Sequence, residues 1–288
     1  MAVELTPVTY ADIADIAEFL RVNMNPRVPW GRACVPPWKA NAPNYGFMLR
    51  DGQRTVGVQT AYYSERLVTG RTERFCNIGT WNVLPGYRPH SIRLVMALLA
   101  QDDYHFPALT PTDRTRAIYA QLNFRPIDMS ASLVPNAPWP AVPGGTMISD
   151  EPAVIEGALD GAELQLYRDH ARTLAAHHHV LVRGGDSCYV MYREARSRGL
   201  LYAVLLHVSN PDLFQSALLP FTRHLLVHHR LAATLGELRI TGQRPRLSVK
   251  LNAGPKMYRT TSLEPGQIDD LYSELVCVPD HAVTQSGR

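Results

Sequence analysis

The sequence predicts a mixed α/β protein made of two similar halves. Helices and strands alternate along the first 130 or so residues, a Pro/Gly-rich stretch follows, and the second half repeats the pattern of the first. At 288 residues the chain is long enough for two domains, and its 45% hydrophobic content supports packed cores. We therefore expect a first domain over 1–132, a linker over 133–145 and a second domain over 146–288.

Periodicity and turn residues predict the elements of the first half. Ile13, Ile16 and Leu20 share one face of a helix, and Asp51 and Gly52 form a tight turn between two strands. In chain order we expect a helix over 9–20, strands over 45–50, 54–65 and 73–84, a helix over 91–100, a strand over 104–109, a helix over 112–122 and a strand from Phe124.

The stretch 23–44 reads as a long, proline-rich loop that contains Trp30 and Trp38. A loop of this length in a compact domain is usually functional or disordered. The two tryptophans predict either a lid, in which both would bind substrate, or two anchors that bury the loop against the core.

The second half repeats the first at a spacing of about 130 residues, which is typical of tandem duplication rather than of a solenoid. Residues 182–190 resemble 49–57, and an aromatic, polar strand follows each. Residues 201–208 and 218–230 match the third strand and the helix after it. The stretch 209–216 corresponds to the segment from Pro85 to Arg88 of the first half, but it has no basic residue.

The segment 81–94 reads as a buried strand, a sharp break at Pro85 and Gly86, and then a helix. Unpaired N–H groups and the positive end of the dipole make a helix start a natural phosphate seat. Arg88, His90 and Arg93 add side-chain donors. The segment therefore predicts a site for the phosphates of a nucleotide-like cofactor.

These motifs resemble the GCN5-related N-acetyltransferase (GNAT) superfamily. Val83, Pro85, Tyr87 and Arg88 match the family's pyrophosphate-binding segment. The family also has a helix that carries a tyrosine and is followed by Leu-Gly-Phe. The helix of Tyr119, followed by Leu-Asn-Phe, is similar to it. The resemblance covers roughly residues 5–130. It implies two tandem GNAT-like domains, each a mixed, mainly antiparallel sheet flanked by helices, with a degenerate second copy.

The resemblance implies an N-acyltransferase that moves an acyl group from acetyl-CoA or a longer acyl-CoA to an amine of a small molecule or peptide. Ser91 and Arg93 stand where the family has glycine, whose missing Cβ lets phosphate approach the backbone. An acyl carrier protein is therefore a serious alternative donor. The implied cofactor-binding residues are Asn82, Val83, Leu84, Arg88, Pro89, His90, Ser91, Ile92 and Arg93.

In the family, a tyrosine at the position of Tyr119 protonates the leaving thiolate, a general-acid role. A backbone N–H of the central strand, near Asn82 to Leu84, would polarise the thioester carbonyl. Glu65 and Glu73 flank the bend between two strands, so either is a candidate general base. The alternative for Tyr119 is an ordinary interior tyrosine. The alternative for the whole protein is a non-catalytic GNAT-fold binding or scaffold protein.

The remaining features exclude other classes. A net charge of +3 is too small to indicate a nucleic-acid partner, and no run of about 18 apolar residues predicts a membrane span. The N-terminus lacks signal-peptide features, and the four cysteines are widely spaced, so we expect reduced thiols and a cytoplasmic location.

The histidines form a rival pattern. Residues 177–179 are three consecutive histidines, and His224 and His228 have metal-ligand spacing on a helix. Consecutive residues of a strand point to opposite faces, so at most two of the three could converge. With no third ligand evident, the sequence predicts no metal site.

Overall fold

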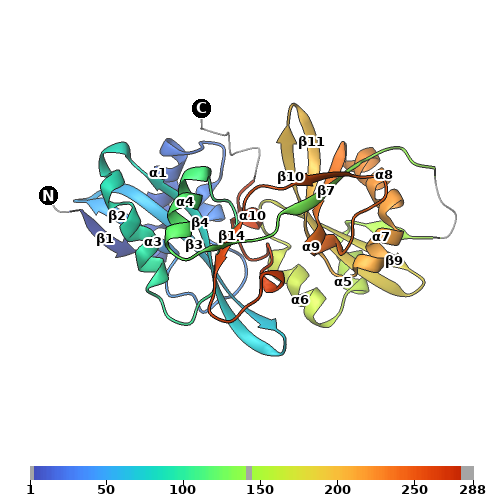
Figure 1. Ribbon diagram of the computed structural model, residues 1–288, viewed down its shortest axis with the longest axis horizontal. Coiled ribbons are helices and arrows are strands. Elements are labelled where there is room, and N and C mark those ends of the chain that lie inside the picture. Colours follow the sequence, from blue (N-terminus) through green and yellow to red (C-terminus); the bar gives the residue numbers. More distant parts are fainter. Residues whose placement is uncertain (1–2, 141–144, 280–288) are drawn as a thin grey trace. The chain divides into compact units, whose positions relative to one another are not determined.

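The computed structural model describes residues 3–140 and 145–279, which form two compact units (Figure 1). The first unit contains residues 3–127, 255–268 and 272–279, and the second contains most of 128–254 together with 269–271. Each unit is built on a mixed sheet of seven strands flanked by helices. The expected architecture of two α/β domains is thus confirmed.

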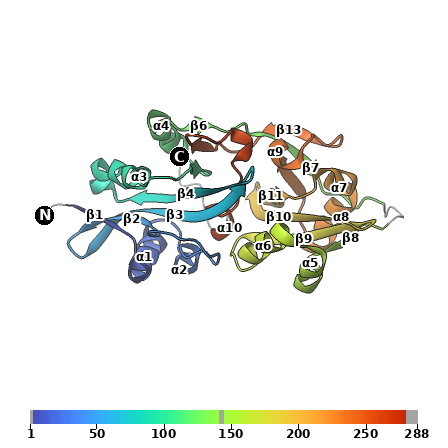
Figure 2. The same cartoon turned by 90° about the horizontal axis from the view of Figure 1, so that it is seen from below.

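The first sheet has the order β1-β2-β3-β4-β5-β14-β6, and among its described strands only the β4–β5 pair is parallel. Figure 2 shows α1 and α2 on one face of this sheet and α3 and α4 on the other. The strands are β1 (Glu4–Pro7), β2 (Gly46–Asp51), β3 (Arg54–Val68), β4 (Arg71–Val83), β5 (Phe106–Ala108), β6 (Arg125–Pro126) and β14 (Met257–Arg259). The helices are η1 (Tyr10–Asp12), α1 (Ile13–Asn23), α2 (Trp30–Ala33), η2 (Pro85–His90), α3 (Ile92–Leu99), α4 (Asp113–Gln121), η3 (Pro265–Gln267) and α10 (Glu274–Cys277), of which η1, η2 and η3 are 3-10 helices.

The second sheet has the order β13-β7-β12-β11-β10-β9-β8, and within the part that the structure describes only the β11–β12 pair is parallel. Its strands are β7 (Ser130–Pro135), β8 (Met147–Ser149), β9 (Ala176–Arg183), β10 (Asp186–Ser197), β11 (Leu200–Val208), β12 (Ala233–Glu237) and β13 (Val249–Asn252). Its helices are α5 (Pro152–Ala158), α6 (Gly161–His170), α7 (Pro211–Ser216), α8 (Leu218–His229) and α9 (Leu238–Thr241).

The long hairpins of the two sheets share the same turn. Thr69 and Gly70 connect β3 to β4 with φ of +48° and +83°, and Arg198 and Gly199 connect β10 to β11 with φ of +49° and +83°. Two successive positive φ values are the mark of a type I′ turn, whose twist matches that of paired strands. The matching turns agree with the duplication predicted from the sequence.

Each sheet takes one strand from the other half of the sequence. β14, near the C-terminus, lies between β5 and β6, whereas β7, from the end of the first half, lies between β12 and β13. The expected linker over 133–145 therefore includes part of a sheet strand, and residues 255–268 and 272–279 lie in the first unit rather than in the second domain. Proline content suggested a linker, but long-range strand pairing decides the boundary. Residues 141–144 of the expected linker lie outside the described part.

The apolar side chains and the thiols are largely interior. All four cysteines are buried and free, and burial raises the pKa of the Cys34 and Cys76 thiols to about 12. Neither thiol is activated as a nucleophile, since a reactive cysteine needs a lowered pKa. Among the described residues, no helix combines the length and apolar character that crossing a membrane requires.

Candidate active site

A β-bulge marks the place where β4 separates from β5. On β4, Ile78 pairs with Ala61 of β3, whereas Trp81 pairs with Gln59, so Gly79 and Thr80 together oppose a single β3 residue. The parallel β4–β5 pairing ends at Ile78 and Ala108. In the described sheet, the last part of β4 therefore has no neighbouring strand on its β5 side. Bulges are frequent next to active sites because they redirect the backbone.

The bulge leaves two backbone donors facing the side from which β5 has departed. The N–H of Leu84 donates to the carbonyl of Val56 on β3 at 2.9 Å. Because N–H groups alternate in direction along a strand, those of Trp81 and Val83 point away from β3. Neither N–H group is therefore directed towards the paired strand β3. The N–H of Asn82 faces β3 instead, and its side-chain amide donates to the carbonyl of Asn23 at 3.3 Å.

The bulge depends on a glycine. A Cβ on Gly79 would lie 2.5 Å from Thr60 Oγ1, 2.7 Å from Tyr62 Cε2 and 3.3 Å from Glu274 Oε2. The Gly79 carbonyl also accepts a hydrogen bond from Gln59 Nε2 at 2.7 Å. Close packing and this hydrogen bond hold the backbone of the bulge in one arrangement.

Tyr119 lies on α4, on the face of the sheet that α3 and α4 cover. Its ring centroid is 6.0 Å from that of Trp81 and 4.8 Å from that of Phe124, and the residue is only 3% exposed. Burial raises the pKa of the Tyr119 phenol, and the nearby Glu274 and Cys76 add to the rise. The phenol therefore keeps its proton at neutral pH. The tyrosine is both an interior residue and a protonated donor close to the strand end.

A carboxylate that the sequence reasoning did not single out lies at the bulge. Glu274, on α10, accepts hydrogen bonds from Thr80 Oγ1 at 3.1 Å and from Thr110 Oγ1. Its segment is held by Asn77 Nδ2, which donates to the carbonyl of Tyr272 at 3.1 Å. The residue was missed because its segment was assigned to the second domain. A signal was present, since a glutamate within an apolar run such as 271–278 is rarely there without a partner.

Glu65 and Glu73 lie at the opposite end of the β3–β4 hairpin and have partners there. Glu65 is 3.9 Å from the Arg74 guanidinium, and Glu73 Oε2 is 3.0 Å from His105 Nε2. At about 3.3 Å per residue, Glu73 is roughly 23 Å along β4 from Thr80. Both carboxylates thus lie near the hairpin turn with basic partners of their own, and Glu73 is well separated along β4 from the bulge.

The predicted phosphate segment is a 3-10 helix, η2, that leads into α3. Arg88 and Pro89 are exposed in η2, as is Ile92 in α3. The Arg93 guanidinium donates to the carbonyl of Val3 at 2.8 Å, so this side chain joins α3 to the N-terminal segment. Of the two arginines that were expected to meet phosphate, Arg88 is the one whose side chain faces solvent.

Trp30 and Trp38 both anchor the proline-rich loop. Trp30 Nε1 donates to the carbonyl of Asn25 at 2.9 Å, and Trp38 Nε1 donates to that of Tyr63 at 2.8 Å. Their exposed fractions are 2% and 6%. These contacts correspond to the anchoring alternative, and they leave little of either ring for a substrate.

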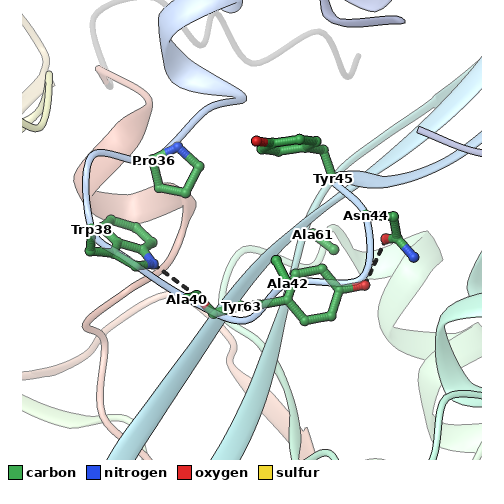
Figure 3. Close-up of a pocket in the computed structure, with 8 residues that line it drawn as sticks. All are labelled: Pro36, Trp38, Ala40, Ala42, Asn44, Tyr45, Ala61 and Tyr63. Atoms are coloured by element: carbon green, nitrogen blue, oxygen red, sulfur yellow. Dashed lines mark hydrogen bonds between the residues drawn. The ribbon is translucent and has the colours of Figure 1, made fainter. Parts of the chain in front are cut away.

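Trp38 also borders a small cavity of about 60 Å³ between the loop and β3 (Figure 3). This volume has room for a water molecule or two, but a pocket for a drug-sized ligand measures roughly 300–1,000 Å³. The cavity is therefore too small for a nucleotide cofactor. Its lining residues are Pro36, Trp38, Ala40, Ala42, Asn44, Tyr45, Ala61 and Tyr63.

Solved structures match this arrangement. A GCN5-related N-acetyltransferase from Anabaena variabilis aligns with a TM-score of 0.59 at 14% identity, over 90% of this chain and 72% of that one. The 288-residue chain has a GNAT fold. A GCN5-related N-acetyltransferase from Kribbella flavida aligns with a TM-score of 0.55 at 12% identity, over 90% and 72% of the two chains. A candidate acetyltransferase from Pyrococcus horikoshii aligns with a TM-score of 0.52 at 12% identity, over 98% and 96%.

No known protein-family profile matches the sequence, and no curated protein does. At identities of 12–14%, the structural matches establish the fold and leave the chemistry to be argued from the site. They confirm the GNAT-like architecture that the sequence motifs predicted for both halves.

Proposed function

We propose that this protein transfers an acyl group from an acyl-thioester directly to an amine of a small molecule or peptide. The geometry of the β4 bulge supports the proposal: the Tyr119 ring lies 6.0 Å from that of Trp81, Glu274 accepts a hydrogen bond from Thr80, and the last part of β4 has no described neighbouring strand on its β5 side. Acyl-CoA is the default donor. The GNAT fold of the matched acetyltransferases supports the same reaction class.

The donor would lie along the last part of β4. Its amide and thioester carbonyls would meet the N–H groups of Trp81 and Val83, and its phosphates would lie near the start of α3, where Arg88 and His90 supply donors. Residues Asn82, Leu84, Pro89, Ser91 and Ile92 complete the proposed binding segment. The Arg93 guanidinium donates to the carbonyl of Val3, so we do not propose that it binds phosphate.

The reaction needs no covalent enzyme intermediate. The amine nitrogen attacks the thioester carbonyl, a C–N bond forms, and the C–S bond breaks. Glu274 accepts the proton that the amine loses, and Tyr119 donates a proton to the departing thiolate. The N–H of Val83 stabilises the negative charge that develops on the carbonyl oxygen.

We infer that the first unit carries this chemistry. The segment of the second unit that corresponds to η2 has no basic side chain, and Asn210 Oδ1 already accepts the N–H of Leu213 at the start of α7 at 3.0 Å. A phosphate there would meet a short helix of six residues whose first turn is already capped.

Thermal unfolding with and without donor tests the binding step. Acetyl-CoA, octanoyl-CoA and free CoA should each raise the midpoint in a concentration-dependent way, because a ligand that binds only the folded protein stabilises it. A shift with none of the three would remove acyl-CoA as the donor. A shift only with an acyl carrier protein bearing an acyl-phosphopantetheine arm would identify the alternative donor, which the exposed basic Arg88 would suit.

Turnover of three variants tests the catalytic assignments. With a panel of a polyamine, an amino sugar, an amino acid amide and a short peptide, thiol release is followed for Tyr119→Phe, Glu274→Gln and Glu73→Gln. We expect the first two to lose about 10²–10⁴-fold in turnover with little change in donor affinity, which is the usual contribution of general acid–base groups. If Glu73→Gln is the variant that loses turnover, the base lies at the far end of β4 and our assignment is wrong. Donor binding without thiol release by any amine would favour the scaffold alternative.

A further inference from the structure

Three histidines of the second unit converge on one point. His179 lies on β9, and His224 and His229 lie on α8. One ring nitrogen from each lies within 4.8 Å of the other two, and the Nε2 atoms of His179 and His229 are 3.3 Å apart. The ring centroids of His179 and His224 are 5.2 Å apart.

The fold explains why these three meet. Neighbouring residues of β9 point to opposite faces, so His178 turns towards Tyr189, with its Nδ1 2.7 Å from the phenol oxygen, whereas His179 packs against Phe221 of α8. The third member is His229, at the C-terminal end of α8, rather than His228. The sequence-based argument paired His224 with His228, at a spacing of four residues, and did not consider His229.

The separation between His179 and His229 fits a tetrahedral metal. Two imidazole nitrogens bound at about 2.0–2.1 Å to one zinc ion with tetrahedral angles lie roughly 3.3 Å apart. This is the separation of the two Nε2 atoms. The remaining separations, at most 4.8 Å, can shorten through rotation of the half-buried His224 and His229 rings.

The cluster also contains a ring nitrogen that lacks a hydrogen bond. Among the described residues, Nε2 of His224 has no partner, although the atom is buried. Leaving a buried polar group unsatisfied normally costs about 1–3 kcal/mol, so such groups call for an explanation.

A carboxylate lies beside the three histidines. Asp150 Oδ2 is 3.6 Å from His229 Nε2, and the pairing of Ser149 with Val180 places Asp150 next to His179 on the adjacent strand. Its side chain is about half exposed, at 51%. This position can be filled by the carboxylate or by a water molecule.

We propose that His179, His224 and His229 bind a divalent transition-metal ion of the zinc class, with Asp150 or water as the fourth ligand. Three imidazoles with one oxygen form a donor set that zinc favours, and oxygen-preferring ions such as Mg²⁺ and Ca²⁺ do not. The ion would join β9 to the C-terminal end of α8. The site lies within the second unit, so it does not depend on the acyl-transfer proposal.

Cobalt(II) is a suitable probe because its visible absorption reports four-coordinate geometry, and zinc can then be measured by competition. The full-length protein, without a histidine tag and stripped with a chelator, is titrated with Co²⁺ and then with Zn²⁺. The variants are His224→Gln, His229→Gln and Asp150→Asn, and His228→Gln is the matched control on the same helix. Far-UV circular dichroism of each apo protein checks that the fold is retained.

We expect the wild type and His228→Gln to bind one equivalent and to develop the absorption of four-coordinate cobalt. His224→Gln and His229→Gln should lose this absorption and bind zinc at least 100-fold more weakly, since even loss of an outer-shell partner costs about 10–100-fold. Asp150→Asn should change the spectrum only if the carboxylate is a ligand. Absence of binding at stoichiometric metal, or equal binding by His228→Gln and the two ligand variants, would overturn the proposal and leave an imidazole–imidazole hydrogen bond as the whole interaction.

Discussion

Replacing Gly79 by alanine would put a methyl group into the β4 bulge where no room exists for it. The added Cβ would lie 2.5 Å from Thr60 Oγ1 and 2.7 Å from Tyr62 Cε2, closer than Cβ atoms approach other atoms in real structures. Neither neighbour can easily retreat. Both residues are only 1% exposed, and the Tyr62 hydroxyl donates to the carbonyl of Ala33 at 3.0 Å.

Overpacking of this kind costs about 1–3 kcal/mol of unfolding free energy. For a unit of 150 or so residues, this corresponds to a fall in Tm of about 2–4 °C per kcal/mol. Gly86→Ala is the matched control, because its Cβ would meet nothing within 4 Å. Urea and thermal unfolding of the two variants beside the wild type measure the difference.

The same substitution has a functional consequence. The new Cβ would lie 3.3 Å from Glu274 Oε2, so relief of the clash should move the proposed base. A small misplacement of a catalytic group can cost about 100-fold in turnover. If Gly79→Ala is as stable and as active as Gly86→Ala, the bulge is not tightly packed and our account of the site is wrong.

Two further predictions follow from individual contacts. Arg88→Gln should weaken CoA binding by about 10–100-fold, which is the usual value of a charge-assisted hydrogen bond. Arg93→Gln should lower Tm without that loss of affinity, because the Arg93 guanidinium donates to the carbonyl of Val3. Calorimetric titration of both variants at two salt concentrations distinguishes them, and equal losses of affinity would contradict the assignment. Burial lowers the pKa of His170 to about 4 from 6.5, so the unfolded chain binds a proton first as the pH falls through this window, and stability that is fully present above pH 6.5 is lost towards pH 4. Urea unfolding at pH 7 and pH 4 should show the wild type losing up to about 3 kcal/mol more than His170→Gln, and equal losses would refute the prediction.

Local patterns predicted the elements of the first half well. The expected helix over 112–122 is α4, with Thr112 as its N-cap, and Asn123 stops it in the left-handed region with φ of +64°. The hairpin turn at Gly52 is present, also with a positive φ. These features depend on neighbouring residues alone, so the sequence contains the information needed to predict them.

Long-range pairing accounts for most of what the sequence did not reveal. β7 and β14 each join the sheet of the other half, which no local composition indicates. Because the C-terminal segment also packs against the first sheet, Glu274 lies at the β4 bulge, although it is about 190 residues from Thr80 in sequence. No local pattern in the sequence indicates a contact over such a separation. His229 was missed for a related reason, since only the packing of α8 on β9 shows which helix position faces His179.

The donor site at the end of β4 can be tested most directly through its backbone amides. In two-dimensional NMR spectra of ¹⁵N-labelled protein, adding acetyl-CoA or octanoyl-CoA should shift the amide resonances of Trp81 and Val83 by far more than that of Asn82, whose N–H faces β3. The same shifts should appear in Tyr119→Phe, because that variant is expected to bind the donor and fail in turnover. Shifts that leave Trp81 and Val83 unchanged while affecting another part of the chain would contradict the proposed site.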